Sequence, residues 1–120
     1  MSAHNVMNSK QFFHGTNATL KPGDLINPGH RPSQYNVYDE AHHVFSAGRA
    51  DQAGAYASYA RSLARMGEIT GPAESHVYEV EHTGPVEAIP SPGNPAVTYY
   101  RSRHPARVIS EVPKGDFPLW

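Results

Sequence analysis

The residues best suited to chemistry are His14, Gly15 and Thr16, which follow the aromatic pair Phe12 and Phe13. An apolar pair ahead of a histidine indicates a short buried strand whose last side chain is polar and faces a cleft. The adjacent glycine has no Cβ and lets a ligand approach the backbone closely, while the threonine adds a hydroxyl donor and acceptor. A histidine at a strand end is also a common structural residue, so this stretch alone does not define a site.

The elements that would position these residues are short strands and one helix. Apolar spacing of three and four residues predicts a helix from Arg49 to Met66, with Gly67 as its C-cap. Strands are expected over 10–14, 25–26, 42–46, 75–82, 86–89 and 107–112. Several short strands around one main helix indicate an α+β fold.

Length and composition limit the classes that this protein can belong to. The 120 residues are expected to form one domain over 10–120, preceded by a flexible N-terminal arm over 1–9. No cysteine is present, which excludes disulfides and thiolate metal sites. The net charge is −1 with scattered charges, so no nucleic-acid partner is expected. No apolar run is long enough for a membrane span, and the polar first ten residues lack a signal-peptide core. We therefore expect a cytoplasmic protein.

Two further stretches of the sequence are candidates for site elements. Residues 27–40 show no periodicity, and their histidine, arginine and tyrosines favour a substrate-facing loop over a plain connector. His42 and His43 are adjacent on an expected strand and would point to opposite faces, so no metal site is expected there. Tyr56 and Tyr59 on the helix are interpreted as core and rim residues rather than catalytic ones.

A set of motifs extends in register from about residue 12 to 112 and resembles the rifamycin ADP-ribosyltransferases. The motifs are Phe13-His14-Gly15-Thr16, Leu20-Lys21-Pro22-Gly23-Asp24, His43-Val44-Phe45-Ser46 before the Ala-rich helix, Val77-Tyr78-Glu79-Val80-Glu81 with Gly84-Pro85-Val86-Glu87, Pro92-Gly93-Asn94-Pro95, and Tyr100-Arg101. Their common order makes the resemblance specific.

The resemblance implies a small ADP-ribosyltransferase-like fold, a split antiparallel sheet around an NAD+-binding cleft. It implies that His14 binds the ribose next to nicotinamide, that the backbone of Gly15 holds the carboxamide, and that Phe45 stacks on the nicotinamide ring. The candidate cofactor-binding residues are then His14, Gly15, Thr16, Phe45, Ser46 and Tyr56, and the candidate catalytic residues are His14, Phe45 and Glu87.

This chain departs from the family pattern at two places. Phe45 stands where the family carries a tyrosine, so the ring face is kept and the hydroxyl is lost. The family has an acidic pair after its Gly-Pro-x-Glu turn, whereas here Glu87 is followed by Ala88 and Ile89. Glu87 is the remaining carboxylate, and it can substitute only if the strand register slips, because one residue of slip reverses the face.

Three functions remain open from the sequence. The first is a mono-ADP-ribosyltransferase that passes ADP-ribose from NAD+ to a hydroxyl of a small molecule, either a rifamycin-type antibiotic such as rifampin, which would confer antibiotic resistance, or another acceptor. The second is a degenerate module that binds NAD+ or ADP-ribose with little chemistry. The third is an unrelated metal-free nuclease or hydrolase that uses His14 and a second histidine. The oligomeric state is not indicated.

Overall fold

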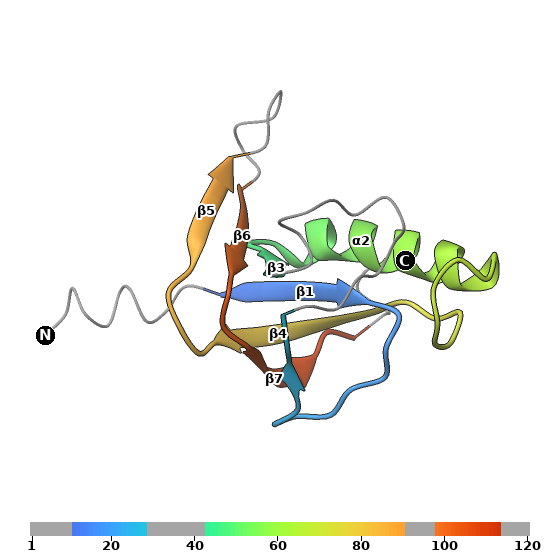
Figure 1. Cartoon of the computed structure of the whole chain (residues 1–120), viewed down its shortest axis with the longest axis horizontal. Coiled ribbons are helices and arrows are strands. Elements are labelled where there is room, and N and C mark those ends of the chain that lie inside the picture. Colours follow the sequence, from blue (N-terminus) through green and yellow to red (C-terminus); the bar gives the residue numbers. More distant parts are fainter. Residues whose placement is uncertain (1–10, 29–42, 91–97, 114–120) are drawn as a thin grey trace, which may run out of the picture.

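The computed structural model describes residues 11–28, 43–90 and 98–113, and every structural statement below concerns these residues. The strands are β1 (Phe12–Thr16), β2 (Leu25–Ile26), β3 (Val44–Ala47), β4 (His76–His82), β5 (Glu87–Pro90), β6 (Thr98–Ser102) and β7 (Ala106–Glu111), and the helix is α2 (Ala50–Arg65). The strands form one antiparallel sheet of seven in the order β2-β7-β4-β1-β3-β6-β5, and α2 lies alongside β1 (Figure 1). The expected α+β class with one main helix is confirmed for the described part of the chain.

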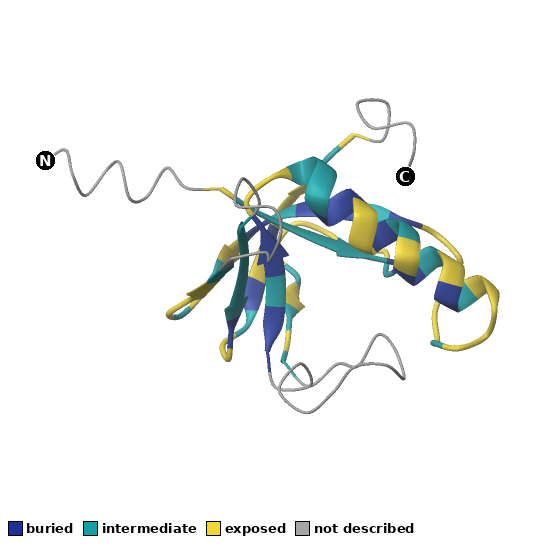
Figure 2. Ribbon diagram, turned by 90° about the horizontal axis from the view of Figure 1, so that it is seen from above, coloured by how far each residue is buried: buried dark blue, intermediate teal, exposed yellow. Residues whose placement is uncertain are grey.

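Helix α2 forms because small apolar residues recur on one of its sides. The buried members of this stripe are Ala53, Gly54, Ala57, Ala60 and Leu63. Buried and exposed residues alternate along α2 in Figure 2, as an amphipathic helix requires. The helix ends before Gly67, which has φ +79° and donates its N–H to the carbonyl of Ala64 at 3.1 Å. A left-handed glycine after the last turn is the expected helix stop.

Two apolar clusters hold the sheet, one on each face, because successive strand residues point to opposite sides. The first cluster contains the buried residues Val44, Tyr78, Val80, Ala106 and Val108, with Phe12 packed against it. The second contains Ala47, Ala53, Ala57 and Val77, with Phe13 packed against it, and lies between the sheet and α2. The two phenylalanines of β1 therefore belong to different sides of the molecule.

The junction between β1 and β3 is the narrowest part of the sheet. β1 pairs with β4 at all five of its residues, but with β3 only at Phe13 opposite Ala47. The family resemblance implied a split sheet around a cleft, whereas the described strands form one sheet that is joined at this junction by a single residue pair. The junction is where the candidate site residues gather.

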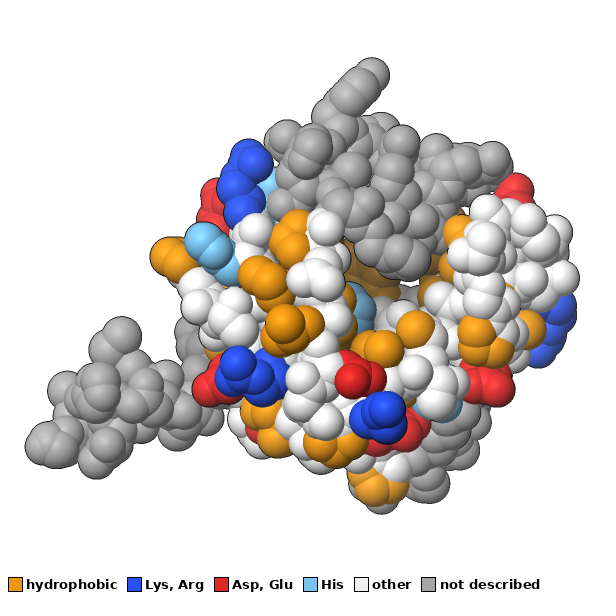
Figure 3. Space-filling model, turned by 60° about the horizontal axis from the view of Figure 1, so that its bottom comes forward, with side chains coloured by type: hydrophobic (Ala, Val, Ile, Leu, Met, Phe, Trp, Pro, Cys, Tyr) orange, Lys and Arg blue, Asp and Glu red, His pale blue; other side chains and the backbone are white. Residues whose placement is uncertain are grey.

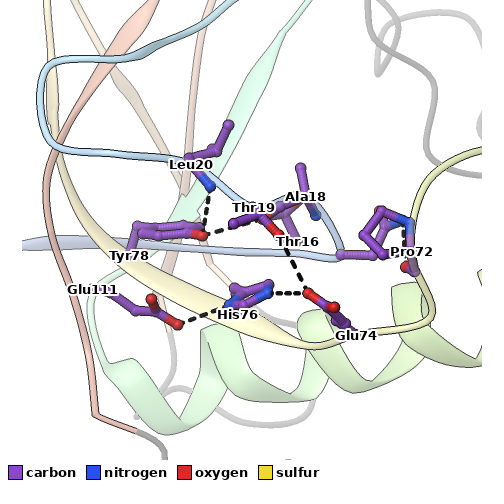
Figure 4. A network of polar contacts seen from close by, with 10 residues as sticks. Thr16, Ala18, Thr19, Leu20, Pro72, Glu74, His76, Tyr78 and Glu111 are labelled. Carbon is purple, nitrogen blue, oxygen red and sulfur yellow. Dashed lines mark hydrogen bonds and ion pairs between the residues drawn. The ribbon is translucent and has the colours of Figure 1, made fainter.

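A polar network anchors the loop after β1 to the sheet (Figure 4). The hydroxyl of the buried Tyr78 accepts the N–H of Leu20 at 2.8 Å and donates to the carbonyl of Ala18 at 3.1 Å. Next to it, the ring of His76 lies between Glu74 and Glu111, with contacts of 2.8 and 2.7 Å to their carboxylates. These contacts fix the end of β1 and the start of β4.

The element boundaries correct two expectations. β1 continues beyond His14 to Thr16, because Gly15 and Thr16 pair with Val77 and His76 of β4. His14 is therefore in the middle of a strand and not at its end. No strand is expected from the sequence over 98–102, yet β6 forms there and pairs with both β3 and β5. The expected arm over 1–9, most of the loop over 27–40 and the tail after 113 lie outside the described residues.

Candidate functional site

A small pocket lies where β1 and β3 diverge beside α2. It is lined by Phe13, His14 and Gly15 of β1, by Phe45, Ser46 and Ala47 of β3, and by Ala53 and Tyr56 of α2. Five of the seven residues selected from the sequence are in this set: His14, Gly15, Phe45, Ser46 and Tyr56. Two strands and a helix thus bring together residues that are up to 42 positions apart in the chain (14 to 56).

His14 bridges the narrow junction with its side chain. Its Nδ1 lies 2.7 Å from the carbonyl oxygen of Phe45. A carbonyl oxygen only accepts hydrogen bonds, so Nδ1 carries the proton and donates. In the neutral ring this leaves Nε2 as an acceptor, which suits it to receive a hydrogen bond from a hydroxyl group.

Aromatic rings surround the pocket on the β3 and α2 sides. The Phe45 ring lies 6.0 Å from that of His43, measured between centroids, at a tilt of 56°. Tyr56 is half-exposed and makes an edge contact with Tyr99, with centroids 5.7 Å apart. The half-exposed ring of Tyr56 gives this pocket an aromatic rim. Tyr59 is also half-exposed, so the expectation that this pair supplies a core residue is wrong.

Gly15 is required for a different reason from the one inferred from the sequence. A Cβ built at this position would overlap the carbonyl oxygen of Ala53 and lie 2.8 Å from the backbone nitrogen of Ala57. The group that approaches the glycine closely is therefore the backbone of α2. Gly15 sets the distance between β1 and the helix, and so sets the width of the pocket.

A second histidine, His82, contacts the pocket residue Ser46. Nε2 of His82 lies 2.8 Å from the hydroxyl oxygen of Ser46, and its ring makes an edge contact with Phe12 at 4.9 Å between centroids. Burial, followed by the positive charge that His14 can carry, lowers the pKa of His82 from 6.5 to about 4. His82 is therefore neutral at physiological pH. Its Nδ1 is buried with no hydrogen-bond partner among the described residues.

Thr16 and Glu87 are not in the pocket. The hydroxyl of Thr16 accepts the N–H of Ala18 at 3.1 Å and so stabilises the turn after β1. Glu87 begins β5, two strands away from β3, and its exposed carboxylate accepts a hydrogen bond from Nε of Arg101 at 2.7 Å. That hydrogen bond and the charge of Arg101 lower the pKa of the Glu87 carboxyl, so it is ionised at neutral pH.

The strand register nevertheless places Glu87 on the same face as Phe45. Phe45 is opposite Arg101 on β6, and Arg101 is opposite Glu87 on β5. Residues directly opposite in an antiparallel pair share a face. No slip of register is therefore needed to bring this carboxylate to the face of the stacking ring, at a distance of about two strand spacings of 4.8 Å each.

His82 is the site residue that sequence reasoning missed. Alternation along the strand expected over 75–82 puts it on the same face as His76, Tyr78 and Val80. What could not be read is that β1 and β3 lie beside β4 in the same sheet and carry Phe12 and Ser46 next to this face, so that His82 meets both side chains. The signal in the sequence was a histidine on the same strand face as Tyr78 and Val80.

The fold and pocket define a small α+β protein whose junction strands present a histidine and an aromatic ring to one pocket. Residues 12–115 match the family model described as "Arr-ms: Rifampin ADP-ribosyl transferase". The chain therefore belongs to the rifampin ADP-ribosyl transferase family, which confirms the resemblance of its motifs and assigns it to the ADP-ribosyltransferases. A search of curated proteins finds none that matches this chain. The helix in the described part of the chain is not long and apolar enough to cross a membrane.

Proposed function

We propose that this protein is a mono-ADP-ribosyltransferase that uses NAD+ as co-substrate and modifies a hydroxyl of a small molecule. The family points to a rifamycin-type antibiotic as the acceptor class. The observation that supports the proposal is the convergence of His14, Phe45 and Tyr56 on one pocket. These are a hydrogen-bonding imidazole and two flat rings, the groups that a ribosyl-nicotinamide would need.

His14 and Phe45 have distinct roles in this proposal. With Nδ1 donating to the Phe45 carbonyl, Nε2 of His14 accepts a hydrogen bond from a hydroxyl of the ribose. The ring of Phe45 stacks on the cationic nicotinamide, a contact worth about 1 kcal/mol and more when water is excluded. Phenylalanine serves for stacking because the interaction uses the ring face and not a hydroxyl.

The residues of the pocket suit the ribose and the nicotinamide ring chemically, but the cavity is too small to enclose the ring. The cavity is about 40 Å³, which holds a few waters at roughly 10–15 Å³ each. A nicotinamide ring therefore binds at the mouth of the pocket, or the half-exposed Tyr56 ring turns outward to admit it. Both arrangements keep His14 and Phe45 on the inner wall.

In the proposed reaction the bond between nicotinamide and the ribose C1 breaks, nicotinamide leaves with the bonding pair, and the acceptor oxygen bonds to C1 as its proton is lost. Glu87 is the carboxylate that we assign to the acceptor side, since it shares a face with Phe45. In the structure the Glu87 carboxylate forms an ion pair with Arg101. It must therefore exchange the Arg101 contact for the acceptor hydroxyl in order to act as the base.

A second function, a module that binds NAD+ or ADP-ribose with little chemistry, has a specific observation in its favour. Glu87 does not line the pocket, and it is followed by Ala88 and Ile89 rather than by a further carboxylate. A protein of this kind would bind NAD+ or ADP-ribose without efficient transfer, because loss of a positioned acid or base reduces rates by roughly 10²–10⁴-fold. Both functions require nucleotide binding at the same pocket.

One experiment separates these functions. The purified protein is incubated with NAD+, with and without rifampicin, and the products are followed by mass spectrometry. An adduct of rifampicin with one ADP-ribose supports the transferase and its acceptor together. Release of nicotinamide without an adduct supports the enzyme with another acceptor. Intact NAD+ in both samples, with NAD+ binding retained, favours the binding module.

A pair of variants tests the pocket itself. His14→Ala is expected to weaken NAD+ binding by about tenfold, because it removes the imidazole whose Nε2 accepts a hydrogen bond from the ribose. His76→Ala is the control, since the His76 ring lies between Glu74 and Glu111 and not in the pocket. Equal NAD+ affinity in the two variants, measured by calorimetry, would remove His14 from the binding site.

A further inference from the structure

A second, larger pocket lies next to the first on the β5–β6 part of the sheet. Its cavity is about 240 Å³, and it is lined by His43, Pro85, Val86, Glu87, Arg101, Ser102, Arg103 and His104. The residue types differ from those of the first pocket, because basic side chains predominate over apolar ones. None of the residues chosen from the sequence as cofactor-binding lies in it.

The charges around this second pocket suit an anion. Among the described residues that line it, there are two guanidinium groups, of Arg101 and Arg103, and one carboxylate, that of Glu87. This leaves one positive charge before the imidazoles of His43 and His104 are counted. The hydrogen bond and charge of Arg101, and then the charges of His43 and Arg103, lower the pKa of the Glu87 carboxyl, in agreement with the place of all four residues in one pocket lining.

The wall of the second pocket is fixed by its own hydrogen bonds. The hydroxyl of the buried Ser102 donates to the carbonyl of Pro85 at 2.7 Å and accepts the N–H of His104 at 3.1 Å. Gly84 packs so closely against the ring of His104 that a Cβ there would overlap it. The turn that carries Arg103 and His104 is therefore tied to the segment that leads into β5, which lowers the cost of ordering them around a ligand.

The two pockets are neighbours on one face of the sheet. His43 lies two residues before Phe45 and their rings are 6.0 Å apart, while Arg101 is directly opposite Phe45. A ligand in the first pocket that stacks on Phe45 would therefore have the basic groups of the second within reach of a short linker.

We propose that this second pocket is a phosphate-binding site, built from Arg101, Arg103 and the histidines beside them, with Glu87 as its built-in competitor. Guanidinium groups bind phosphate oxygens in a planar, bidentate manner. An incoming phosphate takes over part of the Arg101 contact and releases Glu87 from it. The phosphate comes either from the diphosphate of the donor nucleotide, a case that rests on the proposed function, or from a separate phosphorylated molecule.

Inorganic pyrophosphate is the probe that tests the site without any transfer reaction. Calorimetric titration of the full chain should show saturable binding of pyrophosphate. Arg103→Ala should weaken it by about tenfold, because it removes a charge-assisted contact from an exposed turn. Glu87→Gln should tighten it, because it removes the competing carboxylate. Arg107→Ala is the matched control, since Arg107 is an exposed arginine that pairs with Glu81 on β4, outside the pocket.

The results have clear meanings. Absence of pyrophosphate binding, or an equal loss in the Arg103 and Arg107 variants, would overturn the proposal, because it would show only general attraction to positive charge. If NAD+ displaces pyrophosphate, and Arg103→Ala weakens NAD+ as well, the site holds the donor's diphosphate. If pyrophosphate binds equally well with and without saturating NAD+, the site serves a phosphorylated acceptor. Pyrophosphate binding by a chain that does not bind NAD+ would refute the proposed function and leave the phosphate site standing.

Discussion

Acidification should destabilise this protein through His82. The ring is half-buried beside Ser46 and Phe12, and its pKa falls from 6.5 to about 4 in the folded state. The unfolded chain therefore takes up this proton first as the pH falls. The contribution of the neutral His82 ring to the free energy of unfolding is fully present above about pH 6.5 and is lost as the pH falls from there toward about pH 4.

The magnitude follows from the size of the pKa shift. Each pKa unit corresponds to about 1.4 kcal/mol, so the full shift sets an upper limit of about 3 kcal/mol. The ring is partly exposed, and screening by solvent reduces the expected loss to about 1–2 kcal/mol. That is a sizeable part of the roughly 5–15 kcal/mol by which such domains are stable.

Urea unfolding between about pH 7 and pH 4.5 measures this loss in three chains. His82→Phe keeps an aromatic ring against Phe12 but cannot take up a proton. Between these pH values, the free energy of unfolding of this variant should therefore fall by about 1–2 kcal/mol less than that of the unaltered protein. Ser46→Ala removes the hydroxyl that contacts His82 but keeps the titrating ring, so its pH dependence should remain steep. Parallel pH profiles for the unaltered protein and His82→Phe would refute the reasoning, because they would show that His82 takes up its proton equally in both states.

Three further substitutions test how the fold holds the site. Gly15→Ala should cost about 2 kcal/mol or more by thermal unfolding, because the added methyl group overlaps the backbone of α2, and a variant of unchanged stability would show that the helix shifts freely. Tyr78→Phe should cost about 1–3 kcal/mol by denaturant unfolding, since it leaves backbone partners of the loop after β1 unsatisfied, whereas Tyr59→Phe on the exposed side of α2 should change stability by less than about 0.5 kcal/mol. Asn17→Ala removes two amide hydrogen bonds, of 3.1 Å each, to the loop between α2 and β4, and limited proteolysis should then cut that loop faster; unchanged cleavage would mean that the amide is not what holds it.

Local patterns in the sequence predicted the elements well where one face is uniformly apolar. Helix α2 was expected over Arg49–Met66 and is observed over Ala50–Arg65, because alanine spacing and a left-handed glycine determine both its face and its end. The gathering of His14, Phe45 and Ser46 was expected only through family resemblance. Their convergence depends on how β1 and β3 pair, which is a long-range property that no local pattern contains.

The sequence could not resolve features that depend on close approach between elements. Gly15 was interpreted as room for a ligand, but the backbone of α2 fills that side, a contact between residues nearly forty positions apart in the chain. Glu87 was expected to reach the relevant face only after a slip of register. The pairing of β6 with both neighbours puts it there directly, and β6 itself was not predicted as a strand.

The single pair between β1 and β3 makes the sheet mechanically uneven. On one side of it, β2, β7, β4 and β1 form a block backed mainly by α2. On the other side, β3, β6 and β5 are paired with β1 only at Phe13 and Ala47, and the remaining attachment comes from side chains, through the His14–Phe45 and Ser46–His82 hydrogen bonds and the Tyr56–Tyr99 ring contact. Such a junction lets the smaller block swing open without unfolding the larger one, so its amide protons should exchange with solvent sooner. A ligand that contacts both His14 and Phe45 would hold the two blocks together across the junction. Binding would then be reported by slower hydrogen exchange throughout β3, β6 and β5, far beyond the atoms that the ligand touches.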